Sequence, residues 1–380
     1  MRILFSSTPA HGHLLPQLPL ARAFRNRGDQ VAVMTADLFA PVLAPEGIEL
    51  LPAGPGADVL FAESARRTGV DAAADPTPEA VAEFFAGTRI DLTADDALAA
   101  ARTFAPDLIV AEAMDFVGPL VAAALEVPLA TLAFGPAIPA EFTDGVNRMA
   151  ADRYAKRGLT PIPARWYLDP CPDLLQPPGW DAPQTRLPLR PEPHQGPGPA
   201  AVPPAVPERG QGPRVLVTFG THFSDPAALI PILTELRDAG VDLVVTLGLT
   251  ARAEDFGAAG DGVTFTGFAP LAELLHDVDL VVTHGGAGTT LGALARGLPL
   301  VVVPQGADQF LQAAVVDASG AGIAVQPGPD VPQAVAKAVG TLRTDAAYAA
   351  YADAARAVAQ QIQAMPTPAE VAEQLANALN

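Results

Sequence analysis

Cysteine is almost absent from this chain of 380 residues, which contains a single one, Cys171. One cysteine allows no disulfide within the chain, and such usage is typical of a reducing compartment, so we expect a cytoplasmic protein. Long apolar runs are also missing. The richest, 116–134, is interrupted by glycine, proline and glutamate, which predicts buried α/β elements and no stable membrane insertion. The apolar segment before Thr8 and Pro9 is too short for a signal peptide and predicts a first strand.

Positive charge is scarce. Lys and Arg number 23 against 42 Asp and Glu, which gives a formal net charge of -19. Nucleic acid and anionic membranes need a basic face, so we expect neither as a partner. A solvated acidic surface is the simplest explanation, and a cationic partner is the alternative. Apolar residues make up 49% and charged residues 17%, so the chain is globular, and its length predicts about two domains.

Strand-like runs alternate with helical patterns in both halves of the chain, which predicts parallel sheets with covered faces. The helix after the first strand is expected to begin near Leu15 and to stop at Gly28. The expected strands of the first half are Arg2–Ser6, Gln30–Thr35, Asp107–Val110 and Pro128–Ala133. Those of the second half are Arg214–Thr218, Val241–Leu247, Val263–Thr266, Asp279–Thr283, Pro299–Val303 and Gly322–Val325.

The stretch between the two halves, 170–213, is rich in proline. Its composition favours extended chain and lacks donors for a sheet, so we interpret it as an interdomain linker. Two other segments, 54–93 and 137–169, are expected to be irregular and locally helical. A final helix is expected from Ala369 to Leu379, with Thr367 as its N-cap.

The segment from Thr283 to Thr290, THGGAGTT, follows an apolar strand and opens a helical stretch. Glycines let the backbone approach a ligand closely, and a helix start presents free N–H groups and the positive end of the helix dipole to an anion. His284 adds a donor for a phosphate oxygen. The pattern predicts a phosphate-bearing ligand, and a purely structural turn is the alternative.

Three linked motifs carry a family resemblance: Gly267-Phe268-Ala269-Pro270, then His284-Gly-Gly-Ala-Gly-Thr289, then Asp308-Gln309. At these spacings the stretch closely resembles the donor-binding signature of family 1 glycosyltransferases of the GT-B fold, within which it looks like the bacterial enzymes that glycosylate antibiotics. The resemblance implies two Rossmann-like domains whose parallel sheets face a central cleft. It implies an acceptor-binding domain over 1–195, a linker over 196–213, a donor-binding domain over 214–365, and a last helix, 366–380, that packs back on the first domain.

The expected function is that of an inverting, metal-independent hexosyltransferase. It would move a deoxysugar from a nucleoside diphosphate to a hydroxyl of a hydrophobic aglycone, such as a polyketide. No cofactor is expected beyond the TDP- or UDP-sugar co-substrate, and a homodimer is left open. Two alternatives remain: a catalytically silent sugar-nucleotide-binding subunit, and a nucleotide-sugar epimerase on the same fold.

A histidine beyond the carboxyl end of the first strand is well placed to remove a proton. The family pattern G-H-x-x-P matches Gly12 to Pro16, which implies that His13 is the general base and leaves His11 as loop structure. The base needs an orienting carboxylate. Glu112 is favoured by its position at a strand end, and Asp115 is the alternative.

The resemblance also implies the donor contacts. Thr221 is expected to contact the diphosphate. Phe268 is expected either beside the nucleotide base of the donor or in the hydrophobic core. The remaining expected donor-binding residues are His284, Gly286, Gly288, Thr289, Asp308 and Gln309.

Two further features bear on the donor. Asp277 and Asp279 have the D-x-D spacing of metal sites in another glycosyltransferase fold, but here we expect carboxylates at a strand start, and no metal site. Gly292 stands where plant relatives place a glutamate that binds the ribose hydroxyls, which favours TDP over UDP. The alternative is that Gly292 only permits close helix packing.

Overall fold

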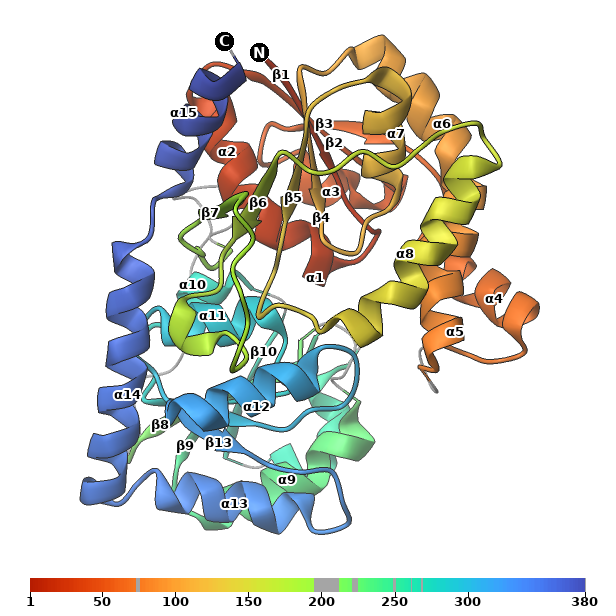
Figure 1. Cartoon of the computed structure of the whole chain (residues 1–380). Coiled ribbons are helices and arrows are strands. Elements are labelled where there is room, and N and C mark those ends of the chain that lie inside the picture. The colour runs from red at the N-terminus through yellow and green to blue at the C-terminus, as the bar shows by residue number, and fades with distance from the viewer. Residues whose placement is uncertain are drawn as a thin grey trace. The chain divides into compact units, whose positions relative to one another are not determined.

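A computed structural model of the protein describes residues 1–72, 76–194, 212–220, 225–248, 251–260, 262–267 and 269–379 (Figure 1). The chain forms two compact units. The first comprises Met1–Pro170, Gly179–Arg190 and Pro366–Asn380, and the second comprises Cys171–Pro178 and Pro191–Met365. The second segment of the first unit, Gly179–Arg190, ends a few residues before position 195, the boundary expected from the sequence. Most of the expected linker, 196–213, lies outside the described residues.

The first unit is built on a parallel sheet of seven strands in the order β3-β2-β1-β4-β5-β6-β7. Buried aliphatic runs form its central strands, because both faces of a parallel sheet are covered. The strands are β1 (Arg2–Ser6), β2 (Gln30–Thr35), β3 (Glu49–Pro52), β4 (Leu108–Glu112), β5 (Leu129–Leu132), β6 (Trp166–Asp169) and β7 (Arg186–Pro188).

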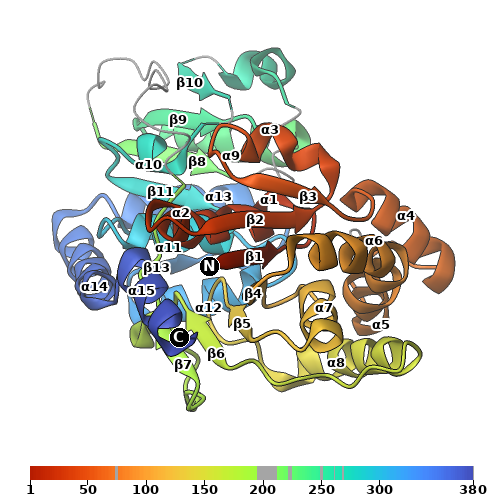
Figure 2. The ribbon, with the colours of Figure 1, turned by 90° about the horizontal axis from the view of Figure 1, so that it is seen from above.

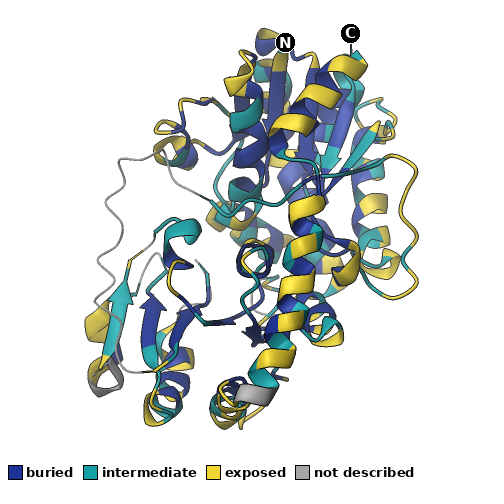
Figure 3. Cartoon of the chain, turned by 90° about the vertical axis from the view of Figure 1, so that its left-hand side faces the viewer, coloured by how far each residue is buried: buried dark blue, intermediate teal, exposed yellow. Residues whose placement is uncertain are grey.

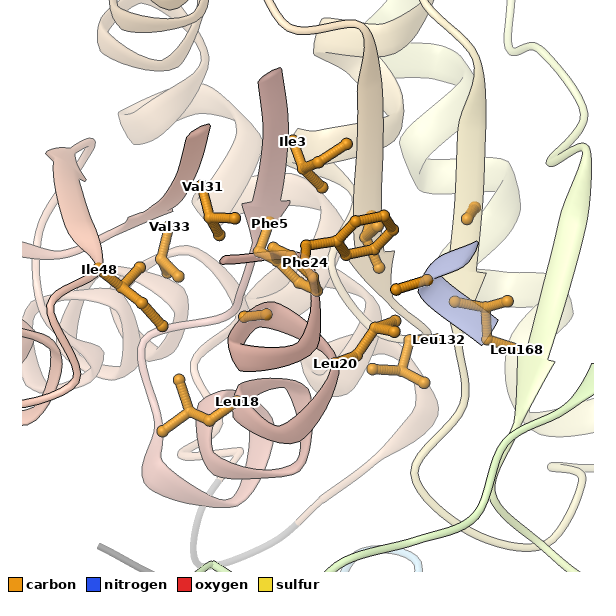
Figure 4. Packing of buried hydrophobic residues seen from close by; sticks show 14 of the residues in the cluster. Ile3, Phe5, Leu18, Leu20, Phe24, Val31, Val33, Ile48, Leu132 and Leu168 are labelled. Carbon is orange, nitrogen blue, oxygen red and sulfur yellow. The ribbon is translucent and has the colours of Figure 1, made fainter. Parts of the chain in front are cut away.

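Alternate residues of the central strands pack into two separate cores. Ile3 and Phe5 of β1 lie against Leu20 and Phe24 of α2 (Leu18–Asn26) on one face (Figure 4). Leu4 packs on the opposite face with α6 (Arg89–Phe104), α7 (Val117–Leu125) and α8 (Ala140–Ala155). In Figure 2, α6 and α7 lie side by side on that face. The same face also carries α4 (Ala57–Thr68), α5 (Pro78–Ala82) and a π-helix, η3 (Glu83–Thr88), that runs directly into α6.

The second unit repeats the architecture with six parallel strands in the order β10-β9-β8-β11-β12-β13. Its strands are β8 (Arg214–Thr218), β9 (Asp242–Thr246), β10 (Val263–Thr266), β11 (Leu280–Thr283), β12 (Leu300–Val302) and β13 (Gly322–Ala324). The inner strands β8, β11 and β12 are fully buried and dark blue in Figure 3, because apolar side chains cover both faces of the sheet, whereas the edge strand β10 is half-buried and teal. The longer helices are α9 (Pro226–Asp238), α11 (Ala287–Leu294), α12 (Gln309–Ser319), α13 (Val331–Thr341) and α14 (Asp345–Ala364).

The predicted strands are confirmed to within two residues at each end. The strands β3 and β6 were not predicted, and β6 lies within 137–169, which was expected to be irregular and locally helical. Two further regions differ from expectation. The segment after β1 begins its helix at His11 as α1 (His11–Leu14), passes through a 3-10 turn, η1 (Leu15–Gln17), and continues as α2. The start near Leu15 was therefore wrong, because Pro16 falls in the 3-10 turn and not in a helix interior. The proline-rich stretch was interpreted as lacking sheet structure, yet β7 pairs with β6 at the edge of the sheet. Pro188 is tolerated there because an edge strand needs fewer donors.

The last helix, α15 (Pro368–Leu379), belongs to the first unit and packs beside α2 (Figure 1). Its N-terminus is a capping box: the Thr367 hydroxyl accepts from Glu370 N at 3.2 Å, and Glu370 accepts from Thr367 N at 2.8 Å. The N-cap expected at Thr367 is confirmed. Across the described ranges, every helix is too short or too polar to cross a bilayer.

Candidate active site

The first sheet reverses its strand order between β1 and β4, which are neighbours although β2 and β3 intervene in sequence. Ligands of open α/β sheets bind beyond the carboxyl ends of the strands at such a switch point. The residues that follow β1 turn into α1, and β4 ends at Glu112. His13 and Glu112 therefore both lie at the carboxyl ends of two adjacent strands, on the same edge of the sheet.

His13 and Glu112 face each other at this edge. The Nδ1 atom of His13 lies 3.0 Å from Oε1 of Glu112, with the histidine side chain 20% exposed and the carboxylate 1% exposed. Two backbone amides also bind the carboxylate: Thr8 N donates to Oε1 at 3.1 Å, and Met114 N donates to Oε2 at 2.6 Å. Because Nδ1 faces Glu112, Nε2 on the far side of the ring is the atom that can take a proton from a substrate.

The electrostatics of Glu112 favour its charged form. Burial by itself raises the pKa of this carboxyl, but the charge of His13 and the hydrogen bonds from His13, Met114 and Thr8 outweigh burial and lower the pKa. A carboxylate that is charged and fixed in place stabilises a protonated imidazole beside it. The pair can therefore accept a proton and hold the resulting charge.

Two phenyl rings flank His13. The ring centroid of Phe85, on the π-helix, lies 5.7 Å from that of His13, and the centroid of Phe134, after β5, lies 5.3 Å away. Both rings exclude water from the histidine and offer apolar surface to a neighbouring ligand. His11 instead packs its ring edge-on against Phe39, at 5.0 Å between centroids, which fits the structural role expected for it.

Asp115 has different partners, so the structure places Glu112, and not the alternative Asp115, against His13. Asp115 is fully buried and pairs with Arg89, whose Nη2 lies 2.8 Å from its Oδ1. It also accepts from the amides of Val117 and Gly118 at the start of α7. Its carboxylate thus caps a helix and neutralises a buried arginine. The sequence favoured Glu112 only by its position at the strand end and left Asp115 open, because the two carboxylates are three residues apart.

The second sheet reverses its order between β8 and β11, and the glycine-rich loop lies at that switch point. His284 is 8% exposed there. A Cβ atom added to Gly220 would lie 2.8 Å from Cε1 of His284, and one added to Gly286 would lie 2.8 Å from Nε2. Because neither glycine has a side chain, the imidazole fits into a narrow slot between two stretches of backbone.

The helix α11 starts at this slot. Gly286 is its N-cap and offers no side-chain cap, so the first-turn amides keep the capacity to bind a ligand. Gly288 is exposed, and a Cβ atom there would meet no atom within 4 Å. Thr289 is half-buried and Thr290 is fully buried. This open helix N-terminus beside a buried histidine is suited to a diphosphate.

Asp308 and Gln309 lie at the start of α12. The buried Gln309 accepts with its Oε1 from the amides of Gln305 at 2.8 Å and Gly306 at 3.1 Å, and so braces the preceding loop. Asp308 is half-buried, and its Oδ2 accepts from Gln312 at 3.2 Å. The expected residues Thr221 and Phe268 lie outside the described residues.

Gly292 lies inside α11 and has a packing role. A Cβ atom on it would lie 2.9 Å from Leu271 Cδ2 and 3.2 Å from Pro193 Cβ. Close packing, the alternative considered from the sequence, therefore accounts for this glycine. It no longer argues for one nucleoside over another.

The D-x-D carboxylates bind an arginine. Asp277 pairs with Arg214 Nη1 at 3.2 Å, and Asp279 accepts from Arg214 N at 2.8 Å. They lie at the amino ends of β8 and β11, the opposite edge of the sheet from His284. The expectation that they are strand-start carboxylates is confirmed.

A hollow of about 400 Å³ lies in the first unit, lined by residues of β6, β7 and α15. It is at the amino ends of these strands, opposite the edge that carries His13. Its two arginines are already engaged: Arg165 donates to the carbonyl of Ala378, and Arg186 binds Asp169. We do not place the chemistry there.

Four residues of the sites were not identified from the sequence: Phe85, Arg89, Phe134 and Gly220. Arg89 is the one that left a signal, because it falls on the apolar stripe of α6 with Ile90 and Ala97. A charged residue on a buried stripe indicates a paired partner.

Two doubly wound parallel sheets, each with a histidine at its switch point, are the arrangement expected of a glycosyltransferase of the GT-B class. The family models for erythromycin biosynthesis protein CIII-like proteins match residues 22–220 with their N-terminal domain and 231–378 with their C-terminal domain. The chain therefore belongs to this family of natural-product glycosyltransferases of family 1.

Curated relatives and solved structures agree with this family assignment. The chain is 33% identical to the elloramycin glycosyltransferase ElmGT of Streptomyces olivaceus, over 99% of this chain and 97% of that one. It is 33% identical to the L-demethylnoviosyl transferase of Streptomyces niveus, over 99% and 98%. Among solved structures, the glycosyltransferase SsfS6 of Streptomyces sp. SF2575 aligns with a TM-score of 0.80 at 29% identity over 99% of both chains. The spinosyn rhamnosyltransferase SpnG aligns with a TM-score of 0.83 at 26% identity over 99% of this chain and 100% of that one.

Proposed function

We propose that the protein is an inverting glycosyltransferase that moves a deoxysugar from thymidine diphosphate to a hydroxyl of a hydrophobic polyketide-like aglycone. The observation that carries the proposal is the His13–Glu112 pair, with 3.0 Å between Nδ1 and Oε1, at the switch point of the first sheet. A silent binding subunit would need no such pair. His284, held between Gly220 and Gly286, lies beside the uncapped N-terminus of α11, and together they supply a site for the anionic diphosphate.

In the proposed reaction, Nε2 of His13 takes the proton of the acceptor hydroxyl as its oxygen attacks the anomeric carbon. The bond from that carbon to the diphosphate oxygen breaks, and its electron pair leaves with the nucleoside diphosphate. Glu112 stabilises the imidazolium that forms. His284 and the first-turn amides of α11 meet the charge on the leaving diphosphate. One-step displacement from the opposite side inverts the anomeric centre.

The donor and acceptor classes rest on the relatives. One relative, 26% identical over 86% of this chain, is the TDP-daunosamine transferase DnrS of Streptomyces peucetius. A second structure of SsfS6, 28% identical, is a complex with thymidine diphosphate. The phenyl rings of Phe85 and Phe134 beside His13 support an apolar acceptor.

The proposed chemistry uses no cofactor and no metal, because protein groups meet the leaving charge. We expect activity to survive EDTA. A loss of activity that Mg²⁺ or Mn²⁺ restores would contradict this part of the proposal. The cytoplasmic location and the homodimer considered from the sequence stay predictions.

The test of the proposal is a donor-dependence assay. A TDP-deoxysugar is incubated with the protein alone and with a panel of polyketide aglycones, and nucleotide release, sugar isomers and glycosides are followed by chromatography. A transferase releases TDP in step with glycoside and only slowly without acceptor. Isomerised sugar in the absence of acceptor would instead identify an epimerase, and binding without turnover would identify a silent subunit.

A further inference from the structure

The peptide unit between Ser7 and Thr8 is held from both ends. Its carbonyl, that of Ser7, accepts from Nη2 of Arg89 at 2.7 Å. Its N–H, that of Thr8, donates to Oε1 of Glu112 at 3.1 Å. The same Oε1 lies 3.0 Å from His13 Nδ1. Arg89 is therefore connected to His13 through one peptide plane and one carboxylate.

Arg89 is itself fixed in place. Its side chain is 1% exposed, and the 0% exposed Asp115 accepts from both its Nε and its Nη2. Its Nη1 has no hydrogen-bond partner among the described residues, although it is buried. An unpartnered buried donor is destabilising, and a buried ion pair is weak evidence for a contribution to stability. The arrangement is better explained by a requirement for a fixed geometry.

The helix that carries Arg89 reaches the site at two points. Arg89 is the first residue of α6, directly after the π-helix η3, and Phe85 lies one turn before it. Phe85 contacts the ring of His13, and Arg89 binds the loop that precedes it. π-helical turns often mark functional sites, because they shift the register of the side chains that follow.

We propose that Arg89 is a positioning residue for the base: it fixes the orientation of the Ser7–Thr8 peptide so that its N–H points at Glu112. This inference rests on the proposed function. If the peptide turned over, its carbonyl oxygen would face the carboxylate and repel it. Glu112 would then shift away from His13, and the imidazole would lose the charge that stabilises its protonated form. Arg89 acts through these groups and contacts no substrate.

The experiment compares Arg89→Met and Arg89→Lys with Arg186→Met as a matched control. Arg186 also pairs with a buried carboxylate of the first unit, Asp169 at 2.8 Å, but at the opposite edge of the sheet. The measurements are kcat, the KM values of donor and acceptor, the pH–rate profile and the thermal midpoint of each variant.

We expect Arg89→Met to lower kcat by about 10- to 100-fold, because small misplacements of a reacting group have effects of this size. The KM of the donor should not change. The acid limb of the profile should move to lower pH, in the direction expected for Glu112→Gln. Arg89→Lys, which retains the charge and can still donate hydrogen bonds from its ammonium group, should restore part of kcat and reverse part of the shift. Arg186→Met should lower the thermal midpoint and leave kcat and the profile unchanged.

Wild-type kcat and profile in Arg89→Met would overturn the inference. So would a loss of kcat with an unshifted profile, because a merely structural role gives that result. If Arg89→Met does not fold, Arg89→Lys decides, and a wild-type rate and profile in that variant would overturn the inference. The proposed function fails separately, if His13→Ala retains full turnover.

Discussion

His13 is the residue on which the proposed chemistry depends, because its Nδ1 lies 3.0 Å from a buried carboxylate and its ring is flanked by two phenyl groups. We predict that His13→Ala lowers kcat by about 10² to 10⁴, the usual contribution of a general base. Donor affinity should stay near that of the wild type, because the expected donor contacts lie in the second unit. Steady-state kinetics and equilibrium binding of TDP measure the two quantities.

The matched control is His11→Ala, two residues away. His11 packs on Phe39 and has no place in the proposed proton transfer. This variant should keep kcat within a few-fold of the wild type. Equal losses in the two variants would show that the loop as a whole, and not the imidazole of His13, was disturbed.

Glu112 gives a prediction about pH. Its pKa in the folded protein lies below the ordinary value of 4.5, so its charged form contributes stability above that pH, and the contribution is lost as pH falls through the lowered pKa. Glu112→Gln lacks this contribution. The stability difference between wild type and variant should therefore be full at neutral pH and shrink below about pH 4.5, as hydrogen exchange of β4 across pH would measure. A difference that grows as pH falls below about 4.5 would contradict the assignment.

At the scale of single residues, the sequence predicted which residue types form the site, but not every contact between their side chains. His13 was found from its position after a strand and its motif. Glu112, the last residue of β4, was favoured over Asp115, three residues later, but only by its position. Which carboxylate faces His13 depends on Arg89, which lies 26 residues before Asp115 in the sequence and binds its carboxylate. Such pairings at long sequence separation leave no local pattern.

At the scale of single elements, the N-terminus of α11 is the feature that should bind the diphosphate. Gly288→Ala provides a selective test, because a Cβ atom there meets no atom of the protein within 4 Å. Stability should be unchanged or rise by about 0.5–1 kcal/mol, since alanine favours a helix over glycine. TDP binding should weaken, because the added methyl group obstructs a ligand that approaches the first-turn amides. Unchanged TDP affinity, measured by calorimetry, would place the diphosphate elsewhere.

Strands and caps were predictable wherever local chemistry decides them. Apolar runs located the central strands, and Thr367 with Glu370 marked the start of α15. The strands β3, β6 and β7 were missed, and β7 is a three-residue strand at a sheet edge, held by pairing with β6. The π-helix η3 was also missed; its first residue, Glu83, binds Thr88 at its other end and Arg67 of α4. Propensity does not encode either feature.

At the scale of the whole molecule, the alternation of strands and helices predicted two parallel sheets, and the strand orders then follow the usual doubly wound pattern. We predict that TDP binds more tightly than UDP. The support is the TDP-named relative and the TDP complex of SsfS6, because Gly292 is explained by packing. Competition of the two diphosphates against a TDP-sugar measures the preference. Tighter binding of UDP would refute it.

The central claim is a one-step transfer with inversion, in which His13 takes the proton. The anomeric configuration of the glycoside, determined by NMR from a reaction with a TDP-deoxysugar of defined configuration, tests this claim most directly. We predict the opposite configuration to that of the donor, with one TDP released for each glycoside formed. Retained configuration would contradict the account, because it requires an intermediate that the His13–Glu112 pair does not provide.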